Sequence, residues 1–346
     1  MASLAEIARL AGVSHMTVSR VLSGRQKGVR SDANDRADDI RRIAAELGYR
    51  PTHAARSLRS GRTGIVALLG GVIMSVDAAN TEDLEAVRTL SSILSSDHGL
   101  NLAAQLEPRS SGGFTLPPWG IDAAVIYSPC SAEDCASAEA ARVPYVTMNG
   151  PSGPNGAAVV LDDDRGMKMA MEHLLGLGHR AICYLGYEAT AFDHPSTSVR
   201  RRAYLREMGA RGLATPPGFD WSLEDWRGRM PEVVAELTKA HGVTAIVTHS
   251  HWQAYQVYDA AGRLGLSIPD DLSVVTFNDT WAGMELMRPA LTAVARPAEA
   301  MARAVASLLV RRLAKGEWPS RVQVVHEELR VRGSTAPPRA AATTTS

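Results

Sequence analysis

The spacing of apolar side chains changes along the chain and divides the sequence into two parts. In the first 50 residues, apolar positions recur every three or four residues, as they do on one face of an α-helix. Leu4, Ile7, Ala8 and Ala11 begin this spacing, and Gly12 interrupts it. We therefore expect a first short helix that ends near Gly12.

Two more helices are expected in this part. Ser14 is placed as an N-cap in front of a helix over His15–Leu22. A third apolar helical face covers about residues 32–47, and Gly48 marks its end. Two short helices joined by a tight turn with a glycine are typical of a helix-turn-helix.

A different pattern begins at Ile65. Continuous apolar runs such as IVALL, AAVIY and LSVVTF alternate with amphipathic segments. Such alternation predicts parallel sheets covered by helices on both faces, and about 270 residues favour two α/β lobes. The last residues, 334–346, are rich in Pro, Ala and Thr, and we expect them to be disordered.

Composition excludes several classes of protein. No apolar run approaches the roughly 18 residues of a membrane span, and the N-terminus lacks the pattern of an export signal. Three cysteines in 346 residues indicate a reducing compartment and not a disulfide framework. A cytoplasmic, nucleoid-associated protein without a membrane partner is expected.

Charge is distributed unevenly although the whole chain is neutral. Residues 1–62 contain 12 Lys and Arg against 6 Asp and Glu, which gives a net charge of +6, and the remainder has −6. A basic head on an acidic body predicts a polyanionic partner for the head alone.

Longer stretches resemble one family. The head reads IARLAGVSHMTVSRVLSG and is followed by AAELGYRPTHAARSLRSGRTG. The body contains VVLDDDRGMKMAMEHLLGLGHR, GLSIPDDLSVVTFND, PALTAVARP and LRVRGSTAPP. In this order, and over almost the whole chain, these stretches resemble the LacI family of bacterial transcriptional regulators.

The resemblance implies an α/β protein with a helix-turn-helix head, a hinge helix and a two-lobed core similar to periplasmic binding proteins. It also implies a homodimer that binds a near-palindromic operator in double-stranded DNA. A small, carbohydrate-like effector between the lobes is expected to control operator affinity. The expected divisions are residues 1–50 for the DNA-binding head, 51–62 for the hinge helix and linker, 63–333 for the effector-binding and dimerisation core, and 334–346 for the tail.

Within the core, the resemblance implies three passages of the chain between lobes. The N-lobe is expected to contain about residues 63–161 together with the crossover and C-terminal returns, and the C-lobe about 162–290. The passages are placed near Leu161–Asp162, Ala290–Ala295 and Trp318–Val322.

Family positions on the second helix suggest how it would contact DNA. Arg20 can donate two hydrogen bonds to a guanine, His15 can donate to a purine N7 or a thymine O4, and Met16 can pack on a thymine methyl. The remaining expected DNA contacts are the hydroxyls Ser14, Thr17 and Ser19, which map to phosphate-binding positions. The alternative is that these hydroxyls only cap or fill the helix.

The hinge contains one isolated apolar side chain, Leu58. In the family this position inserts into a central base step of the minor groove, with Ala55 and Arg56 as neighbours. The alternative is a linker leucine that packs on the core.

Seven residues are expected around the effector: Asn149, Arg200, Trp221, His249, Asn278, Asp279 and Arg296. Arg200 can bind a carboxylate, a phosphate or vicinal hydroxyls, unless it belongs to a solvated run of arginines. Trp221 can stack on a sugar ring or fill the core. Because a histidine can be cationic, His249 favours a ligand with negative charge or with unusual hydroxyl stereochemistry.

Other kinds of site receive less support from the sequence. An α/β enzyme acting on a small polar substrate, with an attached nucleic-acid-binding head, is the alternative function. The sequence contains no nucleotide-binding or nucleophile-elbow motif of the GxGxxG, GxxxxGK[ST] or GxSxG type. We therefore expect no catalytic residues, no cofactor and no metal, since His249 and His251 lack matching ligands.

Overall fold

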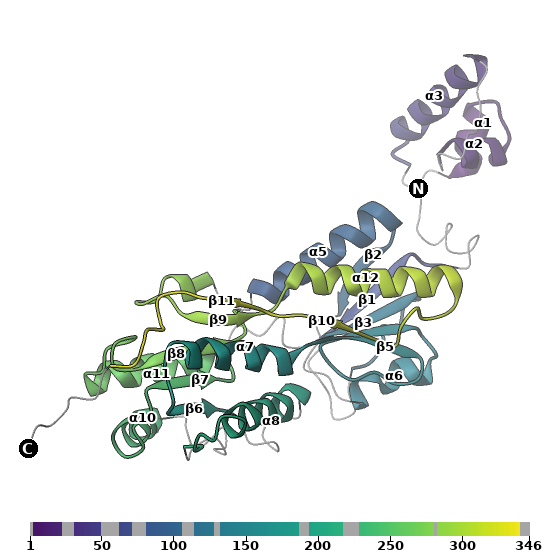
Figure 1. The fold of residues 1–346 in the computed structure, drawn as a ribbon. Coiled ribbons are helices and arrows are strands. Elements are labelled where there is room, and N and C mark those ends of the chain that lie inside the picture. Colours follow the sequence, from purple (N-terminus) through teal and green to yellow (C-terminus); the bar gives the residue numbers. More distant parts are fainter. Residues whose placement is uncertain are drawn as a thin grey trace, which may run out of the picture. The chain divides into compact units, whose positions relative to one another are not determined.

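The computed structural model describes residues 3–22, 31–49, 62–70, 81–105, 114–127, 132–186, 194–216, 228–279 and 282–339 (Figure 1). The chain divides into two compact units, Met1–Thr63 and Gly64–Ser346. Within the described ranges, no helix combines the length and the apolar character that crossing a bilayer requires.

The smaller unit contains the three predicted helices. They are α1 (Leu4–Leu10), α2 (His15–Leu22) and α3 (Ser31–Glu46). One side chain from each, Ile7, Val18 and Ile40, is fully buried in a shared apolar core. The helical spacing of apolar residues therefore identified the inward face of each helix correctly.

Local signals place the helix ends in this unit. Gly12 adopts a φ of 62°, a left-handed conformation that glycine tolerates best, and it ends the first helix. Ser14 Oγ accepts a hydrogen bond from the Thr17 backbone N–H at 3.2 Å, which confirms the predicted N-cap of α2. Gly48 has a φ of 61° beyond α3, as its predicted stop position requires.

The larger unit contains two sheets, and the first is entirely parallel. Its strand order is β10–β5–β4–β3–β1–β2. The strands are β1 (Ile65–Leu69), β2 (Asn101–Gln105), β3 (Ala123–Tyr127), β4 (Tyr145–Met148), β5 (Gly156–Leu161) and β10 (Val322–Val325). Helices α5 (Thr81–His98) and α12 (Ala298–Lys315) cover one face, and η3 (Glu133–Cys135) with α6 (Ala136–Ala140) covers the other.

The second sheet has the order β11–β9–β8–β7–β6. Its strands are β6 (Ile182–Leu185), β7 (Ala245–Thr248), β8 (Ser273–Phe277), β9 (Thr292–Ala295) and β11 (Glu328–Arg330), of which only β11 runs antiparallel to its neighbour β9. Helices α7 (Asp163–Gly176) and α8 (Pro195–Gly209) pack on one face, and α10 (Met230–Lys239) and α11 (His251–Leu264) on the other. A short helix, η4 (Ala282–Glu285), follows β8. These sheets confirm the predicted layers.

Within the described residues the chain passes between the sheets three times, and one of the predicted positions was wrong. The passage at Leu161–Asp162 is confirmed, because β5 belongs to the first sheet and α7 packs on the second. The second passage, at Arg296–Pro297, directly follows the predicted Ala290–Ala295, and the third lies at His326–Glu327, four residues beyond the predicted Trp318–Val322. The C-lobe therefore extends to Ala295, because β9 pairs with β8, a partnership that an apolar run alone does not specify.

The predicted disorder of the tail was wrong for residues 334–339. Ser334 is fully buried, donates to the Val274 carbonyl at 2.6 Å and accepts from the Thr292 N–H at 2.8 Å. His179 Nε2 donates to the Ala336 carbonyl at 2.8 Å. Hydrogen bonds to the second sheet hold this segment, so its low apolar content did not predict its order. Residues 340–346 lie outside the described ranges.

Candidate DNA-binding and effector-binding sites

The predicted base-reading side chains of α2 are exposed to solvent. Met16 is 69% exposed, which is unusual for an apolar residue of this size, and His15 and Arg20 are also exposed. Val18 and Val21 lie on the opposite face and anchor the helix in the core. The helix thus has a buried face that fixes it and an exposed face that can contact a partner.

The three hydroxyl residues of this helix lie in the same region. The Oγ atoms of Ser14 and Thr17 are 2.9 Å apart, and Ser14 also caps the helix. Ser19 is partly exposed on the next turn. Capping is therefore one function of Ser14, and contact of these hydroxyls with phosphates stays a prediction.

Four of the predicted site residues lie outside the described residues. They are Ala55, Arg56 and Leu58 of the hinge, and Trp221 of the effector site. Their roles stay predictions from the resemblance.

Arg200 lies at the centre of the described polar residues of the larger unit. It is 2% exposed and projects from α8, and its guanidinium lies 3.9 Å from the centroid of the Phe277 ring. Its Nε donates to Asp163 at 2.6 Å, its Nη1 to the His249 carbonyl at 2.8 Å and its Nη2 to Asn278 Oδ1 at 3.4 Å. The alternative of a solvated arginine run is therefore wrong for Arg200.

Asn149 follows β4 and links the two lobes through its backbone. It has a φ of 63°, and its carbonyl accepts a hydrogen bond of 2.7 Å from His194 Nε2. His194 precedes α8 and accepts from the Ser196 N–H through Nδ1, so it caps that helix. Burial lowers the pKa of His194, which agrees with a neutral ring that donates from one nitrogen and accepts at the other. Sequence reasoning did not identify His194.

His249 follows β7 and is neutral, which removes the argument for a negatively charged ligand. Burial, and then the charge of Arg200, lower the pKa of His249 well below its usual value. Its Nδ1 lies 2.7 Å from the hydroxyl of Tyr184 in β6. The cationic form that would favour a negatively charged ligand is therefore disfavoured, and the sequence did not show this because distant residues enclose the ring.

Asn278 and Asp279 follow β8 but have different partners. Asn278 has a φ of 65° and accepts from Arg200. Asp279 accepts from Arg330 at 2.8 Å and from Arg332 at 2.6 Å, both on the C-terminal segment that includes β11. The carboxylate of Asp279 therefore holds that segment against the sheet, while Asn278 belongs to the group around Arg200.

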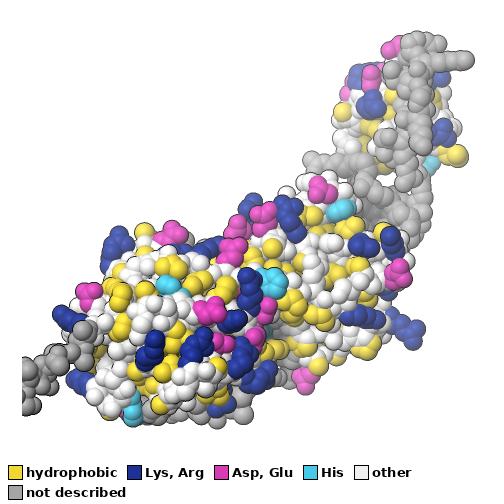
Figure 2. Space-filling view, viewed as in Figure 1, with side chains coloured by type: hydrophobic (Ala, Val, Ile, Leu, Met, Phe, Trp, Pro, Cys, Tyr) yellow, Lys and Arg dark blue, Asp and Glu magenta, His cyan; other side chains and the backbone are white. Residues whose placement is uncertain are grey.

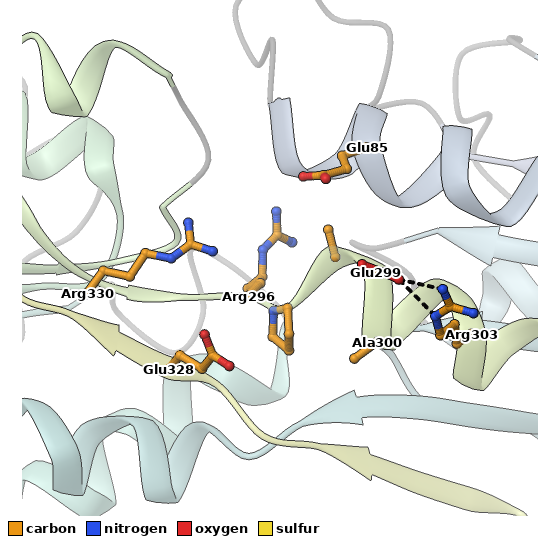
Figure 3. A pocket seen from close by; sticks show the side chains of 9 residues that line it. Glu85, Arg296, Glu299, Ala300, Arg303, Glu328 and Arg330 are labelled. Carbon is orange, nitrogen blue, oxygen red and sulfur yellow. Dashed lines mark hydrogen bonds and ion pairs between the residues drawn. The ribbon is translucent and has the colours of Figure 1, made fainter.

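Arg296 lies at the second passage and contacts α5, which packs on the first sheet. Its Nη2 donates to Asp83 of α5 at 2.6 Å, and the Tyr127 hydroxyl donates to the same carboxylate oxygen. Arg296 also borders a hollow of about 390 Å³ (Figure 3). The hollow is lined by Glu85, Arg296, Pro297, Ala298, Glu299, Ala300, Arg303, Glu328 and Arg330.

Acidic and basic groups are mixed in this hollow and on the visible surface. Three arginines and three glutamates line the hollow, and Arg303 is paired with Glu299 at 2.5 Å. On the face of the larger unit in Figure 2, Lys and Arg side chains are interspersed with Asp and Glu. Of the predicted effector residues that the structure describes, Arg296 alone lines the hollow, whereas Arg200 is hydrogen-bonded to the His249 carbonyl and to Asn278, and Asn149 to His194.

Glu327 is a buried acid at the third passage that sequence reasoning missed. Its side chain is 0% exposed, and neither carboxyl oxygen has a hydrogen-bond partner within the described part of the chain. Burial, followed by the nearby charge of Asp163, raises the pKa of Glu327 to about 8. Two adjacent glutamates, separated from the strand sequence VQVV only by His326, were the one available signal.

Comparisons with known proteins cover both units. Residues 3–52 match the model of bacterial regulatory proteins, lacI family, and residues 171–335 match a periplasmic binding protein-like domain. An uncharacterized HTH-type transcriptional regulator in the aml 5' region of Streptomyces limosus is 32% identical to this chain over 349 residues. That alignment covers 96% of this chain and 94% of the relative.

Solved structures agree with this likeness. A complex of the transcriptional regulator CelR with cellobiose has a TM-score of 0.64 and 26% identity, and the alignment covers 96% of this chain and all of that one. The lac repressor dimer bound to operator and the anti-inducer ONPF has a TM-score of 0.73 over 97% of this chain and 99% of that one. At 19% identity, the second comparison shows a shared fold.

Proposed function

This chain belongs to the LacI family of bacterial regulatory proteins, and we propose that it is a repressor that binds a near-palindromic operator as a homodimer. Like its relatives, it is a DNA-binding transcriptional regulator. In the proposal, a small polyhydroxylated effector binds between the two lobes, is released unchanged, and alters operator affinity by changing the relative positions of the lobes.

The exposed face of α2 carries the DNA-binding part of the proposal. Met16, His15 and Arg20 extend from a helix that Val18 and Val21 fix in the core. A rigid helix with a methyl-contacting and a guanine-contacting side chain suits the major groove. The net charge of +6 over residues 1–62 supports attraction to phosphates.

The effector part is supported by polar residues at the carboxyl ends of parallel strands. Asn149, His249 and Asn278 follow β4, β7 and β8, and α/β proteins bind ligands at such ends. Hydrogen bonds among Arg200, Asn278 and the His249 backbone connect two of these ends. The CelR relative, which was solved with cellobiose, makes neutral sugars the first ligands to try.

Selection of DNA fragments from a random pool by the purified full chain tests the proposal. We expect a palindromic site whose affinity falls steeply as salt rises, because phosphate contacts release counterions. Titration of that site with neutral sugars, cellobiose among them, then tests the effector. Selected fragments without twofold symmetry would contradict the dimeric operator, and a site insensitive to every sugar would contradict the effector class.

A further inference from the structure

The orphaned carboxyl of Glu327 gives information about the ligand. Buried polar groups in folded proteins nearly always have hydrogen-bond partners, and a carboxyl without one is costly. Neither oxygen of Glu327 has a partner within the described ranges, although the side chain is fully enclosed. The site therefore contains a buried acid that makes no side-chain hydrogen bond with the described residues.

Neighbouring residues place this acid beside the proposed effector site. Glu327 Oε1 lies 3.9 Å from Nη2 of Arg200, the same nitrogen that donates to Asn278. On its other side, a Cβ at position 166 would collide with the Glu327 carboxyl, so Gly166 of α7 makes room for it. Glu327 is therefore held next to the polar residues that follow β7 and β8.

The guanidinium of Arg200 already donates hydrogen bonds to other groups of the protein. Arg200 donates to Asp163, to the His249 carbonyl and to Asn278, which engages all three nitrogens of its guanidinium. An anionic ligand at Arg200 would lie beside the carboxyls of Asp163 and Glu327. The unused group at this point is an acid and not an arginine.

We propose that Glu327 is a specificity residue of the effector site, where its carboxyl receives a hydrogen bond from a hydroxyl or amino group of the ligand. The same carboxyl disfavours ligands with a carboxylate or phosphate at that position, because a further acid would have to share Arg200 with the two buried acids Asp163 and Glu327. This inference depends on the proposed effector function and narrows it to neutral or amine-bearing polyhydroxylated molecules.

The two accepted ligand types differ in their dependence on pH. The charged groups near Glu327 are Asp162, Asp163, Arg200 and Arg296. A protonated amine favours the ionised carboxylate, so its affinity rises as the pH increases from about 6.5 and falls again once the amine itself loses its proton. A hydroxyl can pair with either form of the carboxyl, and its affinity changes little over the same range.

Matched ligands test the proposal on the full chain. Calorimetry measures binding of glucose, glucosamine and glucuronate, together with ribose and cellobiose, to the wild type, Glu327→Gln and Glu328→Gln. Glu328 is the matched control, because it is the next residue and is exposed. We expect a neutral or amino sugar to bind the wild type at least about 100-fold more tightly than the acid, and Glu327→Gln to lose about tenfold, roughly one hydrogen bond to a charged group.

Other results would separate this proposal from the proposed function. Tighter binding of glucuronate than of glucose to the wild type, or a Glu327→Gln affinity within about twofold of wild type, would overturn the role of Glu327. If no sugar bound, the carbohydrate effector itself would be contradicted. In that case, carbon-13 NMR of labelled glutamates still tests Glu327: titration near neutral pH supports an orphaned buried acid, and titration below about pH 5 overturns it.

Discussion

The exposed face of α2 and the buried group around Arg200 are both candidate binding sites, but they are built in opposite ways. On α2, the side chains that would contact DNA are exposed, and the residues that fix the helix lie on its other face. Around Arg200, the functional candidates are themselves part of the core and bond to one another. A substitution on α2 should therefore change binding alone, whereas one in the buried group should change both ligand response and stability.

Removal of Arg200 should give the largest effect. Arg200→Ala leaves Asp163 and Glu327 enclosed without their nearest cation, which should lower the free energy of unfolding by about 3–5 kcal/mol. The response of operator binding to effector should also be lost. Urea denaturation measures the first and operator titration the second. Arg202→Ala, on an exposed position of the same helix, is the control, and an equal loss in both variants would remove the special role of Arg200.

Glu327, which belongs to the same buried group, should make the free energy of unfolding depend on pH. The folded protein raises the pKa of Glu327 to about 8 from its ordinary value of 4.5, so the folded state keeps a proton that the unfolded state loses. Wild-type stability should therefore fall relative to Glu327→Gln as the pH rises from about 4.5 to 8, by a total of about 3–5 kcal/mol, and change little above that. Denaturation at pH 5, 6.5 and 8 tests this, and a difference that is constant with pH would contradict it.

On α2 we expect loss of specificity without loss of stability. Arg20→Ala should cost about 1–3 kcal/mol at each guanine contact and relax the preference at one G·C pair in each half-site. Its unfolding curve should match that of the wild type. Arg41→Ala, an exposed position on α3, is the comparison. An unchanged set of selected DNA sites would show that Arg20 does not read a base.

Replacing Met16 should give the smallest of these effects, a small loss of operator affinity. Met16→Ala removes only apolar contact with a thymine methyl, so we expect a loss of about 0.5–1 kcal/mol of operator affinity. Replacing the contacted thymine by uracil should remove most of that difference. Gel-shift titrations with both DNAs measure it. A loss that persists on uracil DNA would place Met16 elsewhere.

The sequence predictions agree with the structure where the interactions are local in the sequence, and they fail where the interactions join distant segments. The three helices of the smaller unit and the cap at Ser14 were predicted because each depends on residues within about four positions. The third passage was misplaced because pairing of β9 and β11 joins segments more than 30 residues apart. The order of residues 334–339 was missed because hydrogen bonds from Thr292 and to Val274 cross the same kind of distance.

The sequence by itself determined the layered α/β architecture, the helix-turn-helix and the family, because period, capping and motif order are local properties of the chain. It also placed Arg200 among the effector residues through the resemblance. Only the tertiary structure decided that Arg200 is bound to Asp163, that burial lowers the pKa of His249, and that the Glu327 carboxyl has no hydrogen-bond partner among the described residues. The charge and hydrogen bonding of a buried group depend on the side chains that enclose it. Those side chains are distant in the sequence, so no short stretch of sequence reveals them.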